Sequence, residues 1–97
     1  MIRLVESNKS DITARLINLG YQISGCKLDF VDDDGNYKLI SSNPAFEFLY
    51  LEYSAEDEMA YIDYKLVDSD DEVEEDFDFP TEMSKCVSRW NELVRTR

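Results

Sequence analysis

The stretch that decides the fold is CKLDFVDDDGNYKLI, residues 26–40. Before its acidic turn, Cys26, Leu28 and Phe30 alternate with charged residues, which gives one buried and one wet face. Gly35 follows an aspartate and supplies the positive φ that tight hairpin turns need. The residues after the turn alternate in the same way, so the stretch predicts a β-hairpin.

Two more strands are predicted beyond the hairpin. Asn43-Pro44 breaks the chain, because proline has no N–H to donate and restricts the residue before it. A third strand follows from Ala45 to Tyr53, and both of its faces are rich in apolar groups, which favours a central strand covered on both sides. The fourth strand runs from Met59 to Val67 with clean alternation. Its inward residues are Ala60, Ile62, Tyr64 and Leu66.

A helix is predicted before the hairpin. Apolar residues recur there at helical spacing, so the helix begins at Ser7 or Ser10 and ends at Leu19. Gly20 fits the left-handed position that ends a helix. Residues 2–6 form either its first turn or a short strand. After Gly20 the apolar residues recur at every second position instead of at helical spacing. Gly25 is a suitable place for a bulge that shifts this alternation by one residue.

A second helix closes the chain. It follows Phe79-Pro80-Thr81, with Pro80 in its first turn, and ends at about Arg95. One stripe of it is apolar, formed by Met83, Val87, Trp90 and Val94 with Cys86 and Leu93 beside them. Residues 1–97 are therefore predicted to be a single acidic α+β domain. Its antiparallel four-stranded sheet is flanked by an N-terminal and a C-terminal helix, α-ββββ-α.

Composition excludes several function classes. The 97 residues include no histidine, which removes the Ser–His and Cys–His nucleophile arrangements and the commonest metal ligand. Cys26 and Cys86 lie in no CxxC pair, so two buried free thiols are predicted, with a disulfide between them as the alternative. No 18-residue apolar run or signal peptide is present, which favours a cytoplasmic protein without a membrane partner. We predict no catalytic residue, metal or cofactor.

The charge is concentrated in one part of the chain. The formal net charge is −12, but residues 29–82 alone carry −17. The densest part is DSDDEVEEDFD, residues 68–78, in which eight of eleven residues are carboxylates. They are Asp68, Asp70, Asp71, Glu72, Glu74, Glu75, Asp76 and Asp78. Two smaller clusters are Glu56, Asp57 and Glu58, and the turn from Asp32 to Asp34.

The acidic run has three interpretations: a solvated loop between the fourth strand and the last helix, a cation site, or a surrogate for nucleic-acid phosphates. A calcium loop fails on spacing, because the run has no glycine, and placing Gly35 sixth puts Ser41 where a glutamate is needed. In an extended chain, alternate carboxylates share a face at about 6.6 Å, which is comparable with the separation of successive phosphates. Phe77 and Phe79 would anchor the segment and hold Asp76 and Asp78 outward.

Direct nucleic-acid binding is not predicted. Affinity for nucleic acid comes mostly from Lys and Arg on phosphates, and a net charge of −12 opposes it. Packing in the core and at its rim is the better account of four of the six tyrosines, namely Tyr50, Tyr53, Tyr61 and Tyr64. Tyr61 lies on the polar face of the fourth strand and is also a candidate contact residue.

The hairpin turn and return strand, VDDDGNYKLISS from Val31 to Ser42, resemble those of acidic anti-CRISPR proteins that block an RNA-guided nuclease. Small acidic α+β chains of this length are typical of phage-encoded DNA mimics, including anti-restriction proteins. This resemblance implies an inhibitor that occupies a DNA-binding groove in a nuclease or defence complex, in the host cell cytoplasm. The chain departs from the pattern by placing its acids late, in residues 68–78.

These observations predict a stoichiometric inhibitor that binds a basic protein partner, such as a DNA- or RNA-guided nuclease complex. Its main contacts would be the eight carboxylates of residues 68–78, with Glu56, Asp57 and Glu58 secondary. One alternative is an immunity protein that covers a cognate basic nuclease toxin. The other is an adaptor whose acidic loop is merely solvated.

Overall fold

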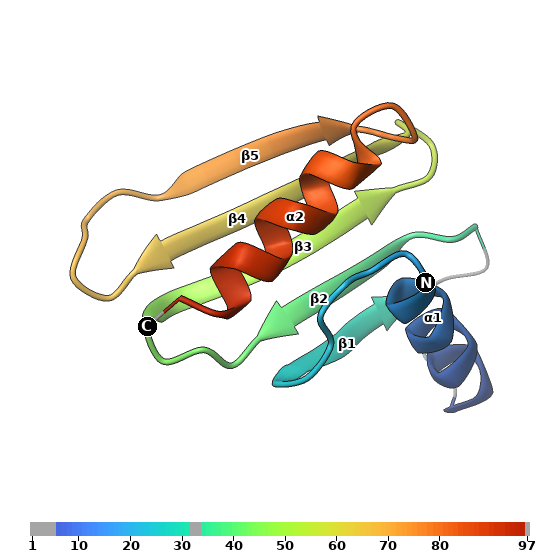
Figure 1. Ribbon diagram of the computed structural model, residues 1–97, viewed down its shortest axis with the longest axis horizontal. Helices are drawn as coiled ribbons and strands as arrows, with labels where there is room; N and C mark the ends of the chain where they lie inside the picture. The colour runs from blue at the N-terminus through green and yellow to red at the C-terminus, as the bar shows by residue number, and fades with distance from the viewer. Residues whose placement is uncertain (1–5, 32–33, 97) are drawn as a thin grey trace.

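The structure is a computed structural model that describes residues 6–31 and 34–96. It is an α+β fold, in which one antiparallel sheet of five strands in the order β1-β2-β3-β4-β5 packs against two helices (Figure 1). The elements in chain order are α1 (Glu6–Asn18), β1 (Cys26–Val31), β2 (Tyr37–Ser41), β3 (Phe46–Ser54), β4 (Met59–Leu66), β5 (Val73–Asp78) and α2 (Met83–Val94).

The fifth strand corrects the predicted α-ββββ-α order. β5 lies inside the acidic run and pairs with β4 along the edge of the sheet, from Met59 opposite Asp78 to Tyr64 opposite Val73. Asp and Glu are depleted in strands, so the carboxylates hid this element from the sequence patterns. The hairpin was predicted correctly, since β1 and β2 pair with Leu28 opposite Leu39.

Register shifts change which side chains face the core. The shift in the first hairpin lies between Leu28 and Phe30, not at Gly25 where we expected it. A second shift lies between Phe46 and Phe48. Because of it, Phe46 is buried while Phe48 is not, although simple alternation places both on one face. Bulges of this kind are not visible to a period-two pattern.

The helix ends follow local chemistry. α1 ends at Asn18, and Gly20 has a φ of 101°. The Tyr21 N–H donates to the Leu16 carbonyl at 3.0 Å and the Gly20 N–H to the Ile17 carbonyl at 2.9 Å, the Schellman pattern. The prediction for residues 2–6 falls mainly outside the described residues.

The closing helix begins later than we predicted. α2 starts at Met83, so Pro80 lies in the preceding turn rather than in the first turn of the helix. Its buried residues are Cys86, Trp90 and Leu93. The predicted apolar stripe therefore does face the core. Its most buried side chains, however, are Cys86 and Leu93 together with Trp90, rather than their neighbours Val87 and Val94.

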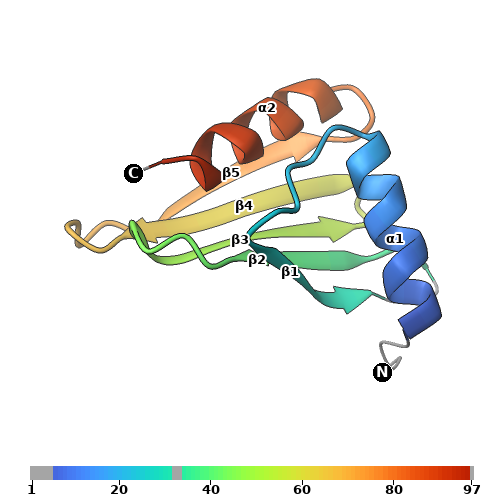
Figure 2. The ribbon, with the colours of Figure 1, turned by 60° about the horizontal axis from the view of Figure 1, so that its bottom comes forward.

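α2 lies over one face of the sheet, and α1 runs across the end of the strands, from the level of α2 down past β1 (Figure 2). α2 crosses over the later strands, and α1 packs beside β1. The core between the helices and the sheet contains Leu16 and Trp90 from the helices, and Leu39, Leu51 and Ile62 from the strands. β3 is central, as predicted, but only one of its faces is covered. No helix in the described parts of the chain is long and apolar enough to span a membrane.

Candidate functional site

The edge strand β5 sorts its carboxylates between the two faces of the sheet. Glu75 and Phe77 lie opposite Ile62 and Ala60, which are fully buried, so these two side chains point toward the helices. Side chains alternate along a strand, and therefore Glu74, Asp76 and Asp78 point away from the helices. We call these three exposed carboxylates the acidic strip.

Contacts on the helical side hold β5 in place. Phe77 is only 8% exposed. Phe79 packs against Tyr53, with ring centroids 5.2 Å apart, and its N–H donates to the Glu58 carbonyl at 2.9 Å. The backbone N–H of Asp78 donates to Glu82 Oε1 at 3.1 Å. Phe77 and Phe79 therefore occupy the anchoring positions predicted for them.

Glu75 corrects the predicted set of contact residues. Arg89 on α2 donates from Nε to both oxygens of the Glu75 carboxylate, at 2.9 and 3.0 Å. Hydrogen bonding to Glu75 raises the pKa of Arg89 above its ordinary value, so the guanidinium stays charged. Glu75 is thus neutralised on the helical side and does not belong to the outward surface.

The remaining predicted acids lie at both ends of the strip (Figure 1). Residues 67–72, which we call the acidic loop, connect β4 to β5 at one end of the sheet. Four of the predicted contact residues lie in this loop, and all four are exposed: Asp68, Asp70, Asp71 and Glu72. The Ser69 hydroxyl accepts a hydrogen bond from the Asp71 N–H at 3.1 Å, which orders the middle of this loop.

The second cluster lies at the opposite end. Glu56, Asp57 and Glu58 occupy the β3–β4 turn, beside the Asp78 end of β5, and all three are exposed. Ser54 Oγ donates to Asp57 Oδ2 at 3.3 Å, and Glu58 has a φ of 53°, in the left-handed region. The acidic loop and this turn are therefore separated by the length of β5.

The third predicted cluster lies mostly outside the described residues, since these exclude Asp32 and Asp33. Asp34 is exposed in the β1–β2 turn, at the same end of the sheet as the β3–β4 turn. Asn36 Oδ1 joins these two turns by accepting a hydrogen bond from the Ala55 N–H at 2.7 Å.

The face of the sheet away from the helices is a feature that sequence reasoning missed. We call it the open face. Phe48 and Tyr50 stack on it with ring centroids 5.8 Å apart, and Lys38 Nζ lies 4.2 Å from the Tyr50 ring centroid. Apart from the carboxylates of β5, Tyr61 was the only residue of this face that we singled out as a contact. The available signal was the second apolar face of the third strand, which we interpreted as a second buried face.

Two carboxylates lie directly opposite each other on the open face. Asp63 on β4 pairs in register with Glu74 on β5. Partial burial and the charge of Asp76 raise the pKa of Asp63. The charge of Asp63 in turn raises the pKa of Glu74. Hydrogen bonding with Glu74 lowers the pKa of Asp63, so of these two carboxyls it is Glu74 whose ionisation the pairing disfavours.

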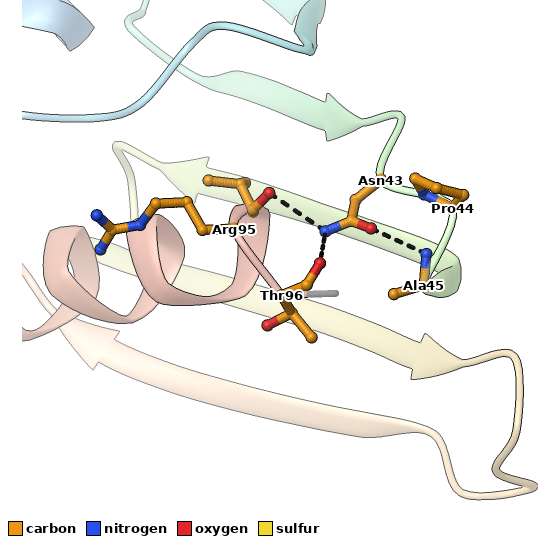
Figure 3. A pocket seen from close by; sticks show the side chains of 6 residues that line it. Asn43, Pro44, Ala45, Arg95 and Thr96 are labelled. Atoms are coloured by element: carbon orange, nitrogen blue, oxygen red, sulfur yellow. Dashed lines mark hydrogen bonds between the residues drawn. The ribbon is translucent and has the colours of Figure 1, made fainter.

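A hollow of about 670 Å³ lies at the end of α2 (Figure 3). Its polar groups serve the helix terminus. Asn43 Nδ2 donates to the carbonyls of Leu93, Val94 and Thr96 at 3.4, 3.2 and 2.7 Å. Asn43 Oδ1 accepts from the Ala45 N–H at 2.9 Å. The hollow is therefore explained by capping of α2 rather than by a ligand.

Comparison of the chain with protein-family models, with curated proteins and with solved structures finds no match.

Proposed function

We propose that the chain is a stoichiometric inhibitor that binds the basic nucleic-acid-binding surface of a nuclease or defence complex. It does so by mimicking the phosphates of DNA, as anti-CRISPR and anti-restriction proteins do. The observation that carries the proposal is the acidic strip. Glu74, Asp76 and Asp78 are exposed at alternate positions of an ordered edge strand, and within residues 6–31 and 34–96 none of them forms an ion pair.

The alternation sets the spacing of the negative charges. Alternate residues of a strand are about 6.6 Å apart, so the strip carries a regular row of carboxylates. The acidic loop extends the row at one end, and the β3–β4 turn extends it at the other. A disordered acidic tail would lose entropy when it met a basic groove, whereas a strand already anchored by Phe77 and Arg89 loses little.

The same charges would speed association. A basic groove attracts an acidic chain at long range, and this steering weakens as salt screens it over about 10 Å at 0.1 M. Edge strands that carry charge also resist pairing with other strands, so the strip favours a partner's side chains over β-augmentation.

A charge-reversal pair with a matched control tests the proposal. Asp71→Lys with Asp78→Lys changes the acidic loop and the strip. Asp11→Lys with Asp29→Lys makes the same change in charge on α1 and β1, at the other edge of the sheet. The immobilised chain is used to capture proteins from the organism that encodes it. We expect the first variant to lose the captured nuclease or DNA-binding protein and the control to keep it.

Competition with DNA gives the decisive result. Duplex DNA should displace the captured protein from the wild-type chain, and the purified pair should show inhibition that saturates at a one-to-one ratio. A stable ternary complex with partner and duplex DNA would overturn the mimicry and would favour an immunity protein that covers another surface of a toxin.

A further inference from the structure

Six residues of the open face form a grid over the last three strands. Register places Tyr50, Asp63 and Glu74 in one row across β3, β4 and β5, and Glu52, Tyr61 and Asp76 in the next row. Residues in these rows belong to the face away from the helices, because their neighbours along each strand, such as Leu51 and Ile62, are buried in the core. Two tyrosines therefore lie diagonally among four carboxylates.

The grid already accepts one cation from its own chain. Lys38 Nζ lies 4.2 Å from the Tyr50 ring centroid and 3.8 Å from Glu52 Oε1. A tyrosine face attracts cations through its quadrupole, and a neighbouring carboxylate adds charge attraction. Lys38 thus shows which chemistry this face binds.

The charge of Lys38 also lowers the pKa of Asp63, but no cation among the described residues pairs directly with the rest of the grid. Neither Asp63, Glu74 nor Asp76 forms an ion pair there, although like charges directly opposite each other destabilise a sheet. Tyr61 lies between Glu52 and Asp76 in its row. A cationic group on Tyr61 would relieve the repulsion between Asp63 and Glu74.

We propose that the open face docks an arginine-bearing surface of the basic partner, with a guanidinium lying on Tyr61 and paired with Asp63, Glu74 and Asp76. This inference rests on the proposed function and names the side chain that the partner brings. Arginine fits better than lysine, because its planar guanidinium stacks on aromatic rings and bonds carboxylates in a bidentate way, whereas an ammonium acts as a point charge.

Other occupants fit the face less well. A second copy of the chain would bring its own carboxylates against Asp63 and Glu74, at a net charge of −12 for each copy. Nucleic acid would place phosphates against the same groups. A surface rich in arginine is the occupant whose charge complements the grid and whose shape suits its rings.

Oligopeptide probes test the inference without knowledge of the partner. Nona-arginine and nona-lysine carry the same charge, and their affinities for the wild-type chain are measured by titration at fixed ionic strength. Both cations can lie on a ring, but only the guanidinium stacks flat on it and pairs with carboxylates in a bidentate way, so we expect nona-arginine to bind about fivefold more tightly.

Three variants locate the preference. Tyr61→Ala should bring the two affinities together, and Asp63→Asn with Glu74→Gln should do the same while keeping the shape of the grid. Asp71→Lys with Asp78→Lys should weaken both peptides equally and leave their ratio unchanged, since these residues lie outside the grid. Equal affinities for the wild-type chain, a ratio unaffected by the grid variants, or self-association of the chain through this face would overturn the inference.

The two proposals fail separately. If duplex DNA fails to displace the partner but the arginine preference depends on the grid, only the mimicry is wrong. If DNA displaces the partner but the two peptides bind alike, the acidic strip acts by its charge alone, without an arginine on Tyr61.

Discussion

Arg89 and Tyr64 both bind the carboxylate of Glu75, and they also bind each other. Arg89 Nε donates to the two Glu75 oxygens, the Tyr64 hydroxyl donates to Glu75 Oε2 at 3.0 Å, and Arg89 Nη2 donates to the Tyr64 hydroxyl at 3.0 Å. One residue comes from β4, one from β5 and one from α2. This network ties the edge strand to the helix, and so it sets the position of the acidic strip on the opposite face.

The first prediction concerns this network. Arg89→Met keeps most of the aliphatic stem but leaves Glu75, whose side chain is 27% exposed, without its cation. Hydrogen bonds to charged groups contribute about 1.5–3 kcal/mol, and with some solvent screening we expect a loss of about 2 kcal/mol in the free energy of unfolding. Urea denaturation followed by circular dichroism measures it.

A compensating variant separates the pair from its surroundings. Arg89→Met with Glu75→Leu replaces both charges by apolar groups, and we expect it to be more stable than Arg89→Met alone. If the double variant loses as much stability as the sum of the two single variants, the pair is not coupled.

Sequence patterns predicted the elements whose apolar residues follow a regular period. The first hairpin, the central third strand, the alternation of Ala60 and Ile62, and the helix before Gly20 were all found this way. β5 was missed because only Val73 and Phe77 interrupt its acids, and its pairing with β4 is a long-range property of the sheet. The strand propensities of individual residues carry no information about which strands pair with each other.

The candidate site was predicted as a list of residues but not as a surface. The register of β5 decides which carboxylates point outward. A shift of one position along the strand separates Glu74, on the open face, from Glu75, which pairs with Arg89 on the helical side. The aromatic part of the open face also depended on the bulge before Phe48, which moved Phe46 into the core and left Phe48 outside.

The second prediction concerns the cap of α2. Asn43→Ala removes the donor to three carbonyls at the helix terminus and the acceptor for the Ala45 N–H. A loss of about 1–2 kcal/mol in the free energy of unfolding is expected, since cap and hydrogen-bond deletions have this magnitude. Asn43→Asp keeps the acceptor but turns a negative charge toward the carbonyl end of the helix, so it should not recover stability at neutral pH. Full recovery in that variant would show that only the bond to Ala45 matters.

The third prediction concerns the two thiols, which are free in the structure. Only Cys86 is fully buried, so the expectation of two buried thiols was right for Cys86 and wrong for Cys26, which is half-buried. Burial raises the pKa of Cys86 to about 11. Because the thiolate is the reactive form, iodoacetamide should modify native Cys26 first and Cys86 only after unfolding.

Mass spectrometry after timed alkylation counts the modified thiols. Cys26→Ser should then remain unmodified in the native state and take up one label in urea. Equal labelling of both residues in the native wild-type chain would mean that Cys86 is accessible through local opening.

The fourth prediction concerns Asp63 and Glu74, whose pKa values are both raised in the folded chain. A carboxyl with a raised pKa keeps its proton to higher pH when folded than when unfolded. The folded chain therefore binds more protons in the acid range above the ordinary carboxyl pKa of about 4. Stability contributed by this pair is thus lost as pH rises through that range toward neutrality, and it is regained on acidification.

Asp63→Asn removes the repulsion and should raise the melting temperature at pH 7 by about 2–4 °C, after allowance for solvent screening. Thermal unfolding is followed at several pH values from the ordinary carboxyl pKa of about 4 up to neutrality. The gain should shrink as the pH falls, because the wild-type pair then shares its protons. Asp70→Asn removes one equal charge from the exposed acidic loop and serves as the control. If both variants change the melting temperature equally at every pH, the effect reflects net charge alone, and the pair on the open face has no energetic role of its own.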